Sequence, residues 1–327
     1  MNIQPSLSPV LLPARPEERP PLPNEPVVRD WPRQAALSAA CLAPELAALE
    51  RFFLWLRAEL DPRLRAAKPV SFGKSYPLGQ CLEISRAAKL ALRGLNGMAP
   101  PEGPARRGRD ALHAFLAAGG TMRQVWGDLR GAYFQNAFLV GTYYVDIAND
   151  TVIAAKPKVE IKPLAEADFR PVRDFAHYAT VARRYWDARV LPNHLLPELA
   201  PWVPAVTIYP GSGVQLDAPT YYMVALCRAG AFAPSEALLA AAPLAHGLFD
   251  LLAGRLAAAG LAVPVSPQAG REAALAACRQ GRAAGWPLDD GRADRAVRGA
   301  LHASRQLAGI TAAYAFTAMP AASAAAD

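Results

Sequence analysis

The chain has 327 residues, of which 52% are hydrophobic, and a formal net charge of +7. This length allows a sizeable core in one large domain or two smaller ones. The first thirty residues lack the basic start and apolar run of a secretory signal, and no stretch of about eighteen apolar residues predicts a membrane span. We therefore expect a cytoplasmic protein with no membrane partner.

The cysteines and the basic residues exclude several further classes. The four cysteines form no CxxC pair and lack the spacing of a zinc site, so neither a disulfide framework nor a metal is expected, and no cofactor is indicated. The densest basic run, ARRGR at residues 105–109, lies in a predicted Pro/Gly-rich loop without interleaved aromatic residues. That pattern favours a solvated surface over a nucleic-acid partner.

The N-terminal half begins with a proline-rich arm, residues 1–32, which we expect to be extended or disordered. From Pro44 to Leu60 apolar residues recur every three or four positions, which predicts an amphipathic helix. Pro77 and Gly79 predict a turn, with a second helix beginning at Gly79 or Gln80. A short third helix is predicted over residues 111–118.

Strand-like sequence follows, from Val125 to Val152, rich in aromatic and β-branched residues. Gly141-Thr142 suits a two-residue hairpin turn, which pairs Val140 with Tyr143. Each residue before Val140 then pairs with the residue equally far beyond Tyr143. A third strand is expected at residues 159–161.

The second half alternates between helix and strand before becoming alanine-rich. Residues 168–189 have helical periodicity, residues 203–209 read as a strand after a proline-rich loop, and Asp217 is placed to cap a helix. Several short helices are predicted beyond Ala233. The predicted fold is α+β: an antiparallel sheet packed on helices at residues 33–230, a helical region at 231–318 and a frayed tail at 319–327.

The stretch VSFGKSYPLGQCLEIS, residues 70–85, contains Gly-Lys-Ser but does not predict a phosphate loop. The glycine that this motif needs five residues before Gly73 is replaced by Lys68, and Tyr76-Pro77 interrupts the following helix. The sequence therefore predicts no nucleotide site there.

Cys81 is the chemically interesting residue of the same stretch, because it falls at the predicted start of a helix. The positive end of a helix dipole lowers the pKa of a thiol, and free amides there can stabilise an oxyanion. The alternative is that Cys81 is a small apolar residue on the buried helix face.

The predicted hairpin adds polar residues. Its register places Gln135 and Asp146 on one face as diagonal neighbours, while Asn136 points to the other face.

A cysteine at a helix start, followed by a hairpin with polar residues on one face, resembles the transglutaminase-like branch of the papain-like cysteine enzymes. The resemblance covers residues 72–152, with YPLGQC as the nucleophile turn and YYVDIAND as the aspartate strand. It implies that Cys81 is the nucleophile, Asp146 the orienting acid, and Gln80 with nearby amides the oxyanion donors. Gln135 stands where the family has its histidine base, and an amide cannot accept the thiol proton.

A base from elsewhere would have to come from His177 or His194, for which structural roles are the alternative. We expect the contacts with a substrate to come from Tyr76, Trp126, Asn136 and His194. Asp128 and Arg130, two apart on one strand, are expected to pair with each other or to hold a charged ligand.

Two functions remain open. One is thiol-dependent acyl transfer or amide hydrolysis of a peptide or small-molecule acyl substrate, with Cys81 as nucleophile. The other is a noncatalytic binding or scaffolding protein in a bacterial biosynthetic or effector system, where the bacterial source is suggested by the high alanine and arginine usage. A proton acceptor within hydrogen-bond reach of the Cys81 sulfur would distinguish the two. A third possibility is that Cys81 is a core residue and the functional surface lies among the C-terminal helices, which complete burial of its sulfur would indicate.

Overall fold

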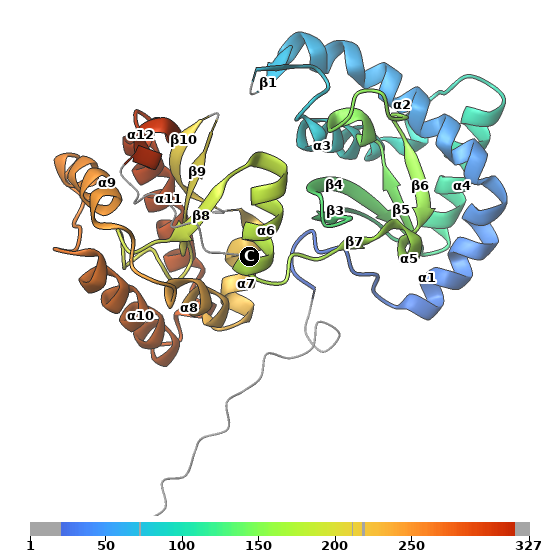
Figure 1. Ribbon diagram of the computed structural model, residues 1–327. Helices are drawn as coiled ribbons and strands as arrows, with labels where there is room; N and C mark the ends of the chain where they lie inside the picture. Colours follow the sequence, from blue (N-terminus) through green and yellow to red (C-terminus); the bar gives the residue numbers. More distant parts are fainter. Residues whose placement is uncertain (1–20, 72, 211, 218–219, 318–327) are drawn as a thin grey trace, which may run out of the picture.

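A computed structural model describes residues 21–71, 73–210, 212–217 and 220–317. Helices, a five-stranded sheet, a three-stranded sheet and a small two-stranded hairpin form two lobes joined near residue 170 (Figure 1). This arrangement confirms the α+β class, the packing of a sheet on helices and the helical C-terminal part. Residues 1–20 of the predicted arm and the predicted tail lie outside the described residues. Among the described helices, none combines the length and apolar character needed to cross a membrane.

The N-terminal lobe places four helices on one face of its sheet (Figure 1). They are α1 (Trp31–Leu37), α2 (Leu46–Ala67), α3 (Cys81–Leu92) and α4 (Pro104–Ala117), with the small hairpin of β1 (Val70–Ser71) and β2 (Lys74–Ser75) between α2 and α3. The predicted helix around Pro44–Leu60 is confirmed as α2, which buries Leu49, Phe52, Phe53 and Leu56 at 0–2% exposure.

Helix α4 differs from the prediction because it already begins at Pro104, so the ARRGR run is helical rather than a loop. Proline suits the first turn of a helix, where its missing N–H has no partner to lose. Gly108 then lets α4 cross α2 closely, since an added Cβ would lie 2.1 Å from the Ala48 carbonyl oxygen.

The five-stranded sheet has the order β6-β5-β4-β3-β7 and is antiparallel throughout. Val140 pairs with Tyr143 across Gly141-Thr142, so the predicted two-residue turn and its register are confirmed. The strands are β3 (Met122–Leu129), β4 (Tyr133–Val140), β5 (Tyr143–Asp146), β6 (Glu160–Pro163) and β7 (Phe169–Arg170).

The two faces of this sheet have different coverings. Phe138 and Val140 of β4 pack in the same cluster as α2, α3 and α4, and we call this side the helix-covered face. Ala137 and Leu139 alternate to the opposite face, where they pack with Phe169 and neighbouring residues. Every functional side chain on β4 therefore belongs to one of two separate environments.

The C-terminal lobe contains a second sheet, β10-β9-β8, whose strands β8 (Arg189–Pro192) and β10 (Gly213–Asp217) the sequence did not predict. The predicted strand at 203–209 is confirmed as β9 (Ala205–Tyr209). These strands share one core cluster with the C-terminal helices. The remaining helices are α5 (Leu164–Ala167), α6 (Phe175–Trp186), α7 (Tyr221–Ala229), α8 (Ala233–Leu239), α9 (His246–Ala258), α10 (Pro267–Ala283), α11 (Asp290–Leu307) and α12 (Ala312–Thr317).

The prediction that Asp217 caps a helix is wrong. Asp217 ends strand β10, and Thr220 caps α7 by accepting a hydrogen bond from the Met223 N–H. The Asp217 carboxylate accepts hydrogen bonds from three hydroxyl groups of its own lobe, those of Tyr178, Thr207 and Tyr209. A carboxylate already held by three donors is a structural group of this second core.

Candidate functional site

Helix α3 begins at Cys81, one or two residues later than the predicted start at Gly79 or Gln80, and a tight turn precedes it. The Gln80 N–H donates to the Pro77 carbonyl at 3.1 Å within this turn. The Gly79 N–H donates to the Thr151 carbonyl at 2.8 Å, which ties the turn to the loop after β5. The start of α3 is therefore held against the sheet rather than free at the surface.

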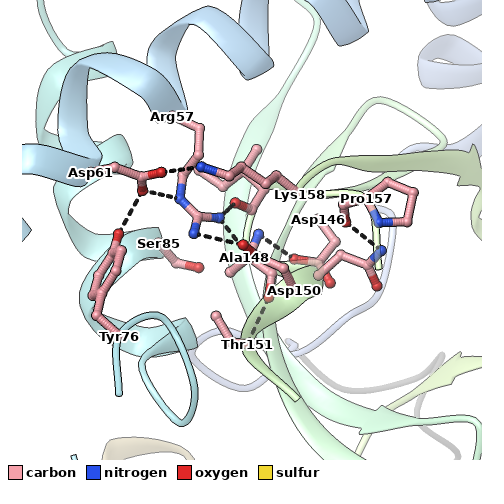
Figure 2. A network of polar contacts seen from close by, with 12 residues as sticks. Arg57, Asp61, Tyr76, Ser85, Asp146, Ala148, Asp150, Thr151, Pro157 and Lys158 are labelled. Carbon is pink, nitrogen blue, oxygen red and sulfur yellow. Dashed lines mark hydrogen bonds and ion pairs between the residues drawn. The ribbon is translucent and has the colours of Figure 1, made fainter. Parts of the chain in front are cut away.

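A network of charged side chains holds the same turn through Tyr76 (Figure 2). Arg57 of α2, fully buried, donates to the Ile147 carbonyl at 2.6 Å and to both carboxylate oxygens of Asp150, and it also pairs with Asp61. Asp61 accepts a hydrogen bond from the Tyr76 hydroxyl at 2.6 Å and a further one from Lys158. Tyr76, predicted to contact substrate, is instead part of this structural network.

The network shifts the pKa values of Arg57 and Asp61 in the directions that keep both side chains charged. Burial alone would lower the pKa of Arg57, but the hydrogen bonds and negative charges of Asp150 and Asp61 raise it overall. Burial alone would raise the pKa of Asp61, yet hydrogen bonds from Lys158 and Tyr76 and the charge of Arg57 lower it. Arg57 and Asp61 are thus both charged and paired with each other at neutral pH.

The polar group that faces the Cys81 sulfur is the side chain of Asn136. Its Nδ2 lies 3.6 Å from Sγ, and the Ser85 hydroxyl of α3 fixes the same stretch of β4 by donating to the Asn136 carbonyl at 3.0 Å. An amide N–H can donate to sulfur but cannot accept the proton of a thiol. The contact therefore orients Cys81 without supplying a base.

Desolvation decides the ionisation of this thiol. Cys81 keeps some solvent exposure as a residue, but protein surrounds its sulfur, and this burial raises its pKa. The Asn136 hydrogen bonds act in the opposite direction, while the charges of Asp146 and Glu83 add to the rise. The structure thus opposes the lowered pKa expected from the helix dipole.

Gln135 and Asp146 form the pair that the hairpin register predicted, but on the opposite face of the sheet from Cys81. Gln135 Nε2 donates to Asp146 Oδ2 at 2.7 Å and to the Ala148 carbonyl at 3.1 Å, and Tyr144 and the Ala148 N–H also donate to Asp146. Burial raises the pKa of Asp146 to about 6 despite these donors. The pair is enclosed among side chains and does not approach the thiol.

The helix-covered face has neither member of a histidine–aspartate pair in front of Cys81. The pairing of β4 with β5 ends at Phe138 and Val145, and Asn136 lies two residues before Phe138 on the same face of β4. Ile147, just beyond β5, is fully buried in the cluster of that face, against which Cys81 also packs. The polar residue that faces the thiol is thus Asn136, and the alternation of side chains along β4 predicts its face from the sequence.

Gln80, predicted to help form an oxyanion hole, is fully buried and otherwise engaged. Its Nε2 donates to the Lys68 carbonyl at 2.9 Å, and its Oε1 has no partner among the described residues. The neighbour that sequence reasoning missed is Tyr185 of α6: burial, and then the charges of Cys81 and Tyr133, raise its pKa. The Tyr185 ring itself packs against Tyr133 and Trp186, with centroids 5.7 and 5.3 Å apart.

The two candidate histidines have partners elsewhere. His177 accepts a hydrogen bond from the Arg173 N–H at Nδ1, so its Nε2 carries the hydrogen that points to Asp128 Oδ2, 2.9 Å away. His194 is fully buried, with Nε2 2.9 Å from the Leu239 carbonyl oxygen in the second core. Both contacts are those of structural histidines.

The last predicted polar residues also have other partners than expected. Asp128 pairs with His177 rather than with Arg130, because Arg130 has a positive φ that turns the chain and directs its side chain to Glu160, 2.7 Å away. The Trp126 ring stacks on Phe134 with centroids 5.0 Å apart. Of the predicted site residues, the structure therefore brings together two separate pairs, Cys81 with Asn136 on the helix-covered face and Gln135 with Asp146 on the opposite face.

No arrangement of three or more metal-binding side chains occurs within the part of the chain that the structure describes. Comparison of the chain with protein-family models, with curated proteins and with solved structures finds no match.

Proposed function

We propose that this protein is a noncatalytic binding or scaffolding protein, in which Cys81 is a structural thiol at the start of α3. The observation that carries the proposal is the group in front of the sulfur: Asn136 Nδ2, 3.6 Å away, is a donor where catalysis needs a proton acceptor. The resemblance to transglutaminase-like enzymes is then one of arrangement, with the reacting groups replaced.

The electrostatics of the site support the same proposal. A cysteine enzyme uses the thiolate, and efficient ones lower the thiol pKa with a histidine or a cation. Burial raises the pKa of Cys81, and the nearest charges named above are carboxylates. A neutral thiol of this kind is a weak nucleophile at neutral pH.

The cysteines and the arginines of the chain bear on its location and its partners. We propose a peptide or small-molecule partner and a location in the bacterial cytoplasm, where the four free cysteines would stay reduced. The basic surface charge is spread over many arginines, several of which are paired with neighbouring acids, as Arg106 with Glu102 and Arg107 with Glu45. Such pairing leaves less charge for nucleic acid.

The test is the pH dependence of iodoacetamide alkylation in the native protein, with each modified cysteine identified by peptide mass. Cys41 is also partly exposed and serves as the reference in the same sample. We expect the alkylation of Cys81 to reach half its maximal rate above about pH 8.5, the ordinary value for a cysteine. A midpoint below about pH 7 would overturn the proposal and favour the acyl-transfer function.

A further inference from the structure

A second feature of the N-terminal lobe lies at the other end of α3 from Cys81. A surface pocket of about 450 Å³ opens between the last turns of α3 and α4 and the start of β3. Cys81 and Arg93 are twelve residues apart on this helix, roughly 18 Å along its axis. The pocket is therefore separate from the candidate site described above.

The floor of the pocket is apolar. Phe138 of β4, which is 1% exposed, lies at its base, and three partly buried side chains surround it. These are Leu92, Leu116 and Met122. A volume of this size with an apolar floor is within the usual range for small-molecule sites.

The rim is polar and contains cations but no acid. The charged lining residues are Lys89, Arg93 and Arg123, joined by the side-chain amides of Asn24 and Gln124. Arg123 donates to the carbonyl groups of Glu25 and Val27, at 2.7 and 2.9 Å. Its side chain is thereby fixed at the edge of the pocket.

Lys89 and Arg93 are the two cations whose charge is not balanced by a neighbour. They lie four residues apart on one side of α3, both are exposed, and neither has an ion pair or a side-chain hydrogen bond with another described residue. Arg123, by contrast, is held in place by the carbonyl groups of Glu25 and Val27, and it lies near the positive charge of Arg29 as well as the negative charge of Glu25. The cations that are free to bind a ligand therefore lie on α3.

The negative ends of two helix dipoles offset only part of this positive charge. The C-termini of α3 and α4 both reach the pocket, and each carries a partial charge of roughly −0.5, about −1 in all. Two unpaired cations exceed this by roughly one positive charge. One singly charged anion would restore neutrality.

We propose that this pocket binds a singly charged amphiphilic anion, a carboxylate with a short apolar chain. The carboxylate lies between Lys89 and Arg93, and the chain covers Leu92 and Phe138. The inference rests on the proposed function in that it names the ligand class of a binding protein. It uses none of the residues around Cys81.

The probe is octanoate, added to protein labelled with ¹³C in the methionine methyl groups. Met122 lines the pocket, whereas Met223 lies fully buried in the second core and reports any general effect. We expect saturable shifts of the Met122 methyl signal, with no shift at Met223. Octanol and octylamine at the same concentrations are expected to shift Met122 much less, because they lack the negative charge.

Two matched charge reversals on α3 locate the site. Lys89→Glu alters a lining residue, and Arg86→Glu makes the same change on an exposed residue that does not line the pocket. We expect the first to weaken octanoate binding about tenfold at low salt and the second to weaken it less than about twofold. Both positions are exposed, so neither change disturbs the core.

Three results would overturn the inference: no shift of Met122 with octanoate, equal binding of octanol, or equal loss in the two variants. Their meaning is distinct from that of the alkylation experiment. Failure of octanoate to bind leaves the conclusion on Cys81 untouched, and a reactive Cys81 would overturn the proposed function without altering the Met122 signal.

Discussion

Replacing Arg57 by methionine tests the network that holds the turn before Cys81. Methionine keeps much of the apolar length of the side chain but removes the charge and four hydrogen bonds. Asp61 keeps its contacts with Tyr76 and Lys158. Asp150, only 4% exposed, loses both of its contacts with the guanidinium group.

The expected cost is that of an uncompensated buried charge. Removing one partner of a buried ion pair typically costs 3 to 5 kcal/mol, so Arg57→Met is expected to lower the free energy of unfolding by about 4 kcal/mol. For a chain of 327 residues that corresponds to roughly 4 to 7 °C in the midpoint of thermal unfolding.

Urea-induced unfolding followed by circular dichroism measures the loss, with Arg63→Met as the matched control. Arg63 is an exposed residue of the same helix, and its replacement is expected to change stability by less than about 0.5 kcal/mol. If the unpaired carboxylate causes the loss, adding Asp150→Asn to Arg57→Met recovers at least about 1 kcal/mol. A loss below about 1 kcal/mol, or no recovery in the double variant, refutes the reasoning.

The remaining predictions concern other buried polar groups. Burial raises the pKa of Asp146 to about 6 from its ordinary 3.8, so its stabilising contribution is greatest below pH 4 and is lost as pH rises through 6. The free energy of unfolding, measured relative to Asp146→Asn, should therefore be about 2 kcal/mol higher at pH 4 than at pH 7.5, and a constant difference would contradict this. Asn136→His places an imidazole beside Sγ and should lower the alkylation midpoint of Cys81 and raise its rate at pH 7 about tenfold; an unchanged rate would mean that position 136 does not control the thiol. His177→Ala leaves Asp128, 3% exposed, without its hydrogen-bond donor and should cost about 1 to 3 kcal/mol in urea unfolding, whereas His177→Gln, which keeps a donor, should cost less; equal losses would speak against the hydrogen bond as the cause.

Much of the local structure of the N-terminal lobe is determined by short-range pattern. The stripe of apolar residues specifies α2, and the proline and glycine before Cys81 specify the start of α3. The two-residue turn at Gly141-Thr142 sets the register of β4 and β5, and the two-residue period of a strand then separates Gln135 from Asn136. Each of these features depends on residues close together in the chain.

Long-range packing decided the elements that the sequence concealed. Gly108 marks a close helix crossing only once α2 and α4 are in contact, and without that contact the ARRGR run reads as a loop. Strands β8 and β10 are short, and β8 even ends on Pro192, so their pairing with β9 outweighs weak local signals.

The candidate site shows most clearly which features the sequence determines and which depend on the tertiary structure. The sequence by itself determined that Cys81 begins a helix, that Gln135 and Asp146 share a face, and that Asn136 points away from them. Only the tertiary structure decided that α3 lies on the face of Asn136. The reason is physical: strand alternation separates the two faces, but the face that the helix covers is chosen by Phe138 and Val140, whose apolar side chains pack with α2, α3 and α4 in one core.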